Sequence, residues 1–116
     1  MDRARRKALS EQFQQATPEA GVYRIVNLRT GRLLLGSTAN LAGLRNRFEF
    51  ARSTGSPAAL DQRLAGDIRS LGLESFSLEV LDRLEPSPEM TPAQIAADLV
   101  TLEALWRERI DQSLLY

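Results

Sequence analysis

The sequence predicts an α+β domain in which a small three-stranded antiparallel sheet is flanked by helices, in the order α-β-β-α-α-β-α. Three observations lead to this class. Two short segments rich in branched residues are separated by a turn, a third segment alternates apolar and polar residues, and four segments carry apolar residues at helical spacing. By its length of 116 residues the chain holds one domain, residues 19–116, preceded by a helical extension, residues 1–18.

The first predicted elements are a helix and a β-hairpin. Residues 3–15 carry Leu9 and Phe13 one helical turn apart, which indicates a short helix. The segments VYRIVN, residues 22–27, and LLLGS, residues 33–37, are typical of strands because they are rich in branched side chains. Only five residues, LRTGR, lie between them, so the two strands must pair antiparallel.

Two helices are predicted to follow the hairpin. The first covers residues 41–54, with Asn40 as its N-cap and Gly55 as its stop. The second is predicted to begin at the Ser-Pro pair of residues 56–57, as a cap followed by a proline in the first turn, and to end at Gly72.

The last elements are a strand and a helix. The segment FSLEVLDRL, residues 76–84, alternates apolar and polar side chains, as a half-buried strand does. Thr91 and Gln94 then form the pattern of a capping box that opens a helix. The apolar stripe expected on this helix consists of Ile95, Leu99, Leu102, Trp106 and Ile110.

Composition limits the chemistry open to the protein. There is no cysteine and no histidine, which excludes disulfides and thiolate or imidazole metal sites and leaves oxygen ligands. Any metal is therefore expected to be a hard cation, Mg²⁺ or Mn²⁺. The basic start MDRARRKALSEQF is followed by no long apolar run, so we expect a cytoplasmic protein without a membrane partner.

Charge is distributed unevenly although the formal net charge is zero. Up to Arg69 the chain holds 12 Lys and Arg against 6 Asp and Glu, and the remainder holds 3 against 9. A basic half favours contact with nucleic acid. The same asymmetry also fits two halves that neutralise each other across the fold, and the sequence leaves both interpretations open.

Several short segments together resemble the GIY-YIG nuclease superfamily. GVY at residues 21–23 and LLG at residues 34–36 resemble its two name-giving motifs, and STANLAGLRNRF at residues 37–48 resembles its run into a helix. SLGLESFSLEVL at residues 70–81 and LVTLEALW at residues 99–106 resemble its third strand and its late helix. The chain is similar to a small, stand-alone and divergent member of this superfamily.

The resemblance implies phosphodiester hydrolysis with one divalent metal, Mg²⁺ or Mn²⁺. Glu103 stands at the position of the metal glutamate and Tyr23 at that of the first motif's tyrosine, near the attacking water. The family's arginine position falls on Leu44, so Arg45 and Arg47 are candidate substitutes, and helix geometry favours Arg47. The second motif's tyrosine is replaced by Leu34, a side chain that can neither donate nor accept a proton.

Each candidate also has an ordinary structural interpretation. A glutamate at the margin of an apolar stripe, such as Glu103, can cover the core with its methylenes, and Tyr23 can fill the core with its hydroxyl at the edge. Arg47 can be a solvated helix arginine. The alternative function is therefore a catalytically inactive module with the same fold that binds nucleic-acid backbone or a protein partner, through its arginines or through Phe50.

The expected partner of the basic half is nucleic acid, DNA in preference to RNA. Forked guanidinium groups suit phosphate oxygens, whereas no aromatic residues interleave with the arginines as base stacking would require. We therefore expect contacts to the backbone. The residues assigned to this contact are Arg24, Arg32, Ser37, Asn40 and Arg52.

Overall fold

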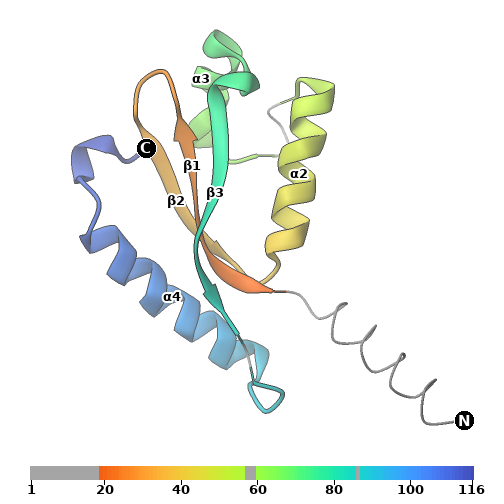
Figure 1. Ribbon diagram of the computed structural model, residues 1–116, viewed down its shortest axis with the longest axis vertical. Helices are drawn as coiled ribbons and strands as arrows, with labels where there is room; N and C mark the ends of the chain where they lie inside the picture. Colours follow the sequence, from red (N-terminus) through yellow and green to blue (C-terminus); the bar gives the residue numbers. More distant parts are fainter. Residues whose placement is uncertain (1–18, 57–59, 86) are drawn as a thin grey trace, which may run out of the picture.

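The structure is a computed structural model that describes residues 19–56, 60–85 and 87–116. Its centre is an antiparallel sheet of strands β1 (Ala20–Asn27), β2 (Leu33–Thr38) and β3 (Phe76–Leu84), in the order β2-β1-β3 (Figure 1). This confirms the predicted α+β class and its three-stranded sheet. The extension predicted for residues 1–18, with its helix at residues 3–15, lies outside the described residues.

The hairpin of β1 and β2 is held at its turn by a buried side chain. Asn27 is fully buried, and its Oδ1 accepts hydrogen bonds from the backbone amides of Arg29 and Thr30 at 3.0 and 3.2 Å. An asparagine that bonds to amides two and three residues on folds the chain into a turn. Gly31 then takes the positive φ of 79° that closes it.

Strand β3 pairs with the other edge of β1, and its register is interrupted once. Tyr23 is opposite Val80 whereas Val22 is opposite Asp82, so one extra residue of β3, Leu81, stands at a bulge. The predicted alternation of β3 therefore holds up to the bulge. Leu81 still packs on the opposite face of the sheet from Leu78, but the next residue, Asp82, also faces α4, where it accepts a hydrogen bond from the indole of Trp106.

Helices cover both faces of the sheet. Helices α2 (Leu41–Thr54) and α3 (Gln62–Leu71) pack on one face, and α4 (Pro92–Glu108) packs on the other (Figure 1). Short 3₁₀ turns precede β3, at Leu73–Ser75, and follow α4, at Gln112–Leu114. In the part of the chain that the structure describes, no helix combines the length and the apolar character needed to cross a membrane.

The predicted start and end of α2 and the predicted start of α4 are confirmed. Asn40 caps α2 by accepting a hydrogen bond from the Gly43 amide at 2.9 Å, and Gly55 ends the helix with a φ of 70°. Thr91 and Gln94 form both hydrogen bonds of the capping box of α4. These signals are local, because each needs only residues within one turn of the helix end.

The predicted start of α3 is wrong. The helix begins at Gln62 and not at the Ser-Pro pair of residues 56–57, and its N-cap is Asp61, whose Oδ1 accepts a hydrogen bond from the Arg63 amide at 2.9 Å. Both patterns are acceptable helix starts in isolation. The helix begins at the later of the two signals, and its two buried residues, Leu64 and Ile68, pack against the sheet.

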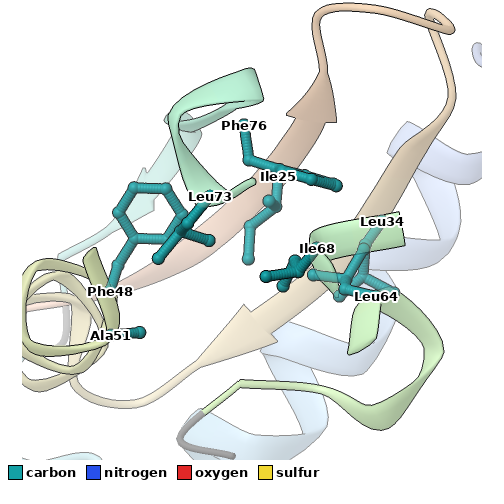
Figure 2. Packing of buried hydrophobic residues seen from close by; sticks show 8 residues of the cluster. All are labelled: Ile25, Leu34, Phe48, Ala51, Leu64, Ile68, Leu73 and Phe76. Carbon is teal, nitrogen blue, oxygen red and sulfur yellow. The ribbon is translucent and has the colours of Figure 1, made fainter. Parts of the chain in front are cut away.

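Two apolar clusters form the core, one on each face of the sheet. The cluster under α2 and α3 holds Ile25, Leu34, Phe48, Ala51, Leu64, Ile68, Leu73 and Phe76 (Figure 2). The cluster under α4 holds the buried residues Val22, Leu33 and Leu35, with partly buried residues around them that include Leu102, Trp106 and Ile110. Ile110 belongs to this cluster as predicted but lies beyond the end of α4.

Candidate functional site

Tyr23 is the centre of the candidate site. Its side chain is half-buried on the α2/α3 face, and its ring crosses from β1 over Gly36 of the edge strand β2. A Cβ atom at Gly36 would lie 2.5 Å from the Tyr23 hydroxyl oxygen. Only a glycine leaves room for this crossing, which brings the hydroxyl to the outer strand of the sheet.

Charged groups from three helical elements act on the Tyr23 hydroxyl. Its pKa is raised above the ordinary value, first by burial and then by the carboxylates of Asp61 and Glu103, while the guanidinium groups of Arg47 and Arg63 oppose the shift. The phenol is therefore protonated at neutral pH. We call Tyr23, Arg47, Asp61, Arg63 and Glu103 the Tyr23 cluster. It joins residues about eighty positions apart in the sequence.

Glu103 is the carboxylate that α4 contributes. About a quarter of its side chain is exposed (27%), and its Oε2 lies 3.4 Å from Nη2 of Arg107 one turn later. It lines a shallow hollow of about 480 Å³ together with Val100, Ala104 and Arg107. The predicted position at the margin of the apolar stripe is confirmed, since the carboxylate reaches solvent while Leu99 on the same helix is buried.

Glu103 could serve as the single protein ligand of a hard cation. Mg²⁺ is commonly bound through one or two carboxylates, with water and substrate phosphate completing its shell. Glu103 supplies one such carboxylate, which has a long ion pair with Arg107 at 3.4 Å, whereas Asp61 accepts two shorter hydrogen bonds from Arg63. Within residues 19–56, 60–85 and 87–116, no three acidic residues gather in one place. Further ligands of the metal would come from water and phosphate.

The structure separates the two candidate arginines of α2. Arg47 flanks the buried stripe of α2 on the side away from Arg45, its charge acts on the Tyr23 hydroxyl, and its guanidinium has no hydrogen bond or ion pair within the described part of the chain. Arg45 lies on the other side of the buried stripe, where it lines a hollow beside β3 with Phe48 and Arg52. The Tyr23 cluster therefore contains Arg47 and not Arg45.

Asp61 and Arg63 were not among the residues predicted for the site. The carboxylate of Asp61 accepts from Nε and Nη2 of Arg63 at 3.0 and 2.8 Å, and these hydrogen bonds lower the pKa of Asp61 to about 2. The pair was missed because the predicted helix start placed both residues inside α3. An aspartate just before the apolar spacing of Leu64 and Ile68 was the available signal.

Leu34 occupies the position of the missing second tyrosine. It is 3% exposed, is opposite Ile25 in the hairpin, and lies against Leu64 and Ile68 (Figure 2). Tyr116 packs on the same cluster, but its hydroxyl donates to Oδ2 of Asp67 at 2.6 Å and accepts from Asn27 at 2.9 Å. Its hydroxyl is thereby used for holding the fold, and it does not replace the second motif's tyrosine.

The residues predicted to contact nucleic acid lie on several elements. Arg24 forms an ion pair with Glu79 at 2.6 Å, and Arg32 lies over the Tyr116 ring at 4.4 Å. Ser37 is half-buried near the end of β2, Asn40 caps α2, and Arg52 lines the hollow beside β3. Of these five side chains, Arg52 shares a hollow with another arginine.

Comparison of the chain with protein-family models, with curated proteins and with solved structures finds no match.

Proposed function

We propose that this protein is a divergent GIY-YIG-type nuclease that hydrolyses phosphodiester bonds of nucleic acid with Mg²⁺ or Mn²⁺. The observation that supports this most is the Tyr23 cluster. One phenol lies within electrostatic range of a carboxylate suited to a hard metal, Glu103, and of the guanidinium groups of Arg47 and Arg63, each from a different helix. Phosphoryl transfer needs this combination of a proton-carrying group, a metal ligand and positive charge.

Each member of the cluster has a role in the proposed reaction. A metal held by Glu103 would polarise the phosphoryl group and stabilise the leaving oxygen. Tyr23 would orient the attacking water through its protonated hydroxyl, and it would relay a proton by taking that of the water while releasing its own to solvent. Arg47, which has no partner in the described part of the chain, neutralises charge that develops on the phosphoryl oxygens, and Arg63 adds a second guanidinium.

The leucine at position 34 leads us to expect a low rate of hydrolysis. The family's second tyrosine is replaced by a core leucine, and the raised pKa of Tyr23 makes its phenol a weak source of phenolate. General acid–base catalysis contributes about 100- to 10,000-fold where a suitable group is present. We therefore expect slow hydrolysis, measurable under single-turnover conditions with enzyme in excess.

The test is cleavage of a labelled plasmid or oligonucleotide by the wild-type protein, by Glu103→Gln and by the control Glu74→Gln. Glu74 is an exposed glutamate in the turn before β3. Cleavage is expected with Mg²⁺ or Mn²⁺ and not with EDTA. The cleavage rate of Glu103→Gln should be at least about 100-fold lower than that of wild type, which is the loss expected when a group that stabilises transition-state charge is removed. Equal nicking by Glu103→Gln and wild type would remove the hydrolase proposal.

The burial of Leu34 favours one second candidate, a module of the same fold that binds nucleic-acid backbone without cutting it. A fluorescence-anisotropy titration with labelled duplex DNA separates the two. Binding that weakens steeply with salt, with no cleavage in Mg²⁺, supports the module. Absence of binding at low salt would exclude its nucleic-acid form and leave a protein partner.

A further inference from the structure

Helix α2 borders a second basic site on its other side. The hollow beside β3, which we call the α2–β3 hollow, has a volume of about 150 Å³ and is lined by Arg45, Phe48, Glu49, Arg52, Ser77 and Leu78. We propose that the α2–β3 hollow binds one phosphoryl group, held by the guanidinium groups of Arg45 and Arg52.

Helix geometry brings these two arginines to one side. They are seven residues apart, which is about two turns and places them within about 20° of each other around the helix. Phe48 lies between them along the helix, and the guanidinium of Arg52 is over its ring at 5.7 Å from the centroid. This contact, together with the shared lining, directs both cationic groups to the same hollow.

The hollow carries excess positive charge. The guanidinium of Arg45 has no hydrogen bond or ion pair to any residue in the described ranges, and that of Arg52 has one ion pair, to Glu49, at 3.8 Å. Glu49 opposes an anion, so two guanidinium groups and one carboxylate leave one unit of positive charge. Guanidinium groups suit phosphate oxygens because their donors form a planar fork.

The size of the hollow selects a small ligand. Pockets for drug-sized molecules measure about 300–1,000 Å³, well above the 150 Å³ found here. Phe48 and Leu78 form the apolar part of the wall, and Ser77 of β3 also lines the hollow. A phosphoryl group fits these limits, whereas a nucleoside does not.

The arrangement on α2 suggests the source of the phosphate. Arg47 extends from the helix toward the Tyr23 cluster, and Arg45 and Arg52 extend toward β3, so a strand lying across α2 would reach both sites. As the source we favour a neighbouring phosphate of the nucleic acid on which the proposed function acts, and in this respect the inference rests on that function. Free phosphate would be bound by the same chemistry.

Two measurements on the full chain test the proposal. One follows arginine Nε–H and backbone amide NMR signals while inorganic phosphate is added, and the other follows duplex DNA binding against salt concentration. Both compare wild type with the double variant Arg45→Gln/Arg52→Gln and with the control Arg69→Gln, an exposed arginine of α3 without a described partner. Matching thermal unfolding curves establish that the variants are folded.

We expect saturable shifts at Arg45, Arg52 and Ser77 in wild type and in the control, and none at the corresponding positions of the double variant. The double variant should also reduce the slope of log K against log salt by about 1, the value for one lost phosphate contact. Saturable shifts with an unchanged slope would support the site for free phosphate and remove the nucleic-acid source. No saturable shifts and an unchanged slope would overturn the proposal. Absence of cleavage would bear only on the proposed hydrolase.

Discussion

The two faces of the sheet differ in how much apolar surface they bury. The cluster under α2 and α3 has eight buried residues, whereas the cluster under α4 has three, surrounded by partly buried side chains. Leu34 and Leu35 show the contrast within one strand. They are neighbours with equal exposure, 3%, and point to opposite faces.

Polar contacts also hold the α4 face of the sheet. Arg24 pairs with Glu79 across β1 and β3, and the indole of Trp106 donates to Oδ2 of Asp82 at 3.1 Å. The candidate site belongs to neither face alone. It forms at the β2 edge of the sheet, where the ring of Tyr23 crosses Gly36 and Glu103 of α4 comes within electrostatic range. The larger buried cluster is thus on one face, whereas the charged groups that act on Tyr23 gather at the β2 edge.

The largest expected effect compares Leu34→Ala with Leu35→Ala. Removing a buried leucine costs about 2–5 kcal/mol of unfolding free energy, more where the surroundings cannot collapse into the cavity. We expect about 3–5 kcal/mol at Leu34 and about 2–3 kcal/mol at Leu35, because the first lies in the larger cluster. Urea denaturation measures both. Equal losses would show that the two faces are packed equally well.

Gly36→Ala tests the crossing of Tyr23 over β2. The new Cβ would lie 2.5 Å from the hydroxyl oxygen and 2.6 Å from Cζ of Tyr23, so the ring must move. We expect a loss of about 1–3 kcal/mol and, under the proposed function, slower cleavage. The matched control is Gly66→Ala in α3, where a Cβ meets open space and stability should rise by up to about 1 kcal/mol. Unchanged Tyr23 ring signals in NMR would contradict the crossing.

Trp106→Phe tests the polar contact on the α4 face. The variant keeps an aromatic ring but removes the hydrogen bond to Asp82, which should cost about 1–2 kcal/mol in urea denaturation. Asp82→Asn keeps an oxygen acceptor for the indole and should cost less than about 1 kcal/mol. If Trp106→Phe were neutral, this hydrogen bond would contribute nothing to the stability of the face.

The smallest expected effect concerns Asp61 and depends on pH. Its pKa is lowered from 3.8 to about 2 by hydrogen bonds from Arg63, so the unfolded chain takes up the proton first as the solution is acidified. The stability that this pair adds is present above pH 3.8 and is lost as the pH falls through about 2. Because the pair is partly exposed, we expect less than about 1 kcal/mol.

Asp61→Asn removes the charge and keeps a side chain that can cap α3. Urea denaturation at pH 6, 4, 3 and 2 should show a wild-type excess in stability that shrinks between pH 4 and pH 2. Asp98→Asn on the exposed side of α4 is the control for the loss of one surface carboxylate. An excess that stays constant down to pH 2 would contradict the role of the Asp61–Arg63 pair.

Much of the fold could be predicted because its signals are local. Asn40, Gly55 and the Thr91–Gln94 capping box each act within one turn of a helix, and the hairpin needs only a short turn. The start of α3 could not be predicted, since the Ser-Pro pair and Asp61 both suit a helix start. The choice between them depends on which segment packs on the sheet beside Leu34.

The candidate site was predicted in part. Resemblance of short motifs pointed to Tyr23 and Glu103, and helix geometry favoured Arg47 over Arg45; in the structure the charges of Glu103 and Arg47 act on the Tyr23 hydroxyl. Asp61 and Arg63 were missed because their place depends on the true start of α3. Arg45 and Arg47 could not be assigned to different sites by spacing alone, since both flank the buried stripe of α2.

Residue types and neighbours along the chain were enough to predict the order of strands and helices in residues 19–116, many of their boundaries, and the restriction to oxygen ligands. The crossing of Tyr23 over Gly36, the effect of Arg63 on Tyr23, and the hollow that Arg45 and Arg52 share depend on tertiary packing. No local pattern predicts these arrangements, because the packing of helices on both faces of the sheet brings together residues far apart in the chain.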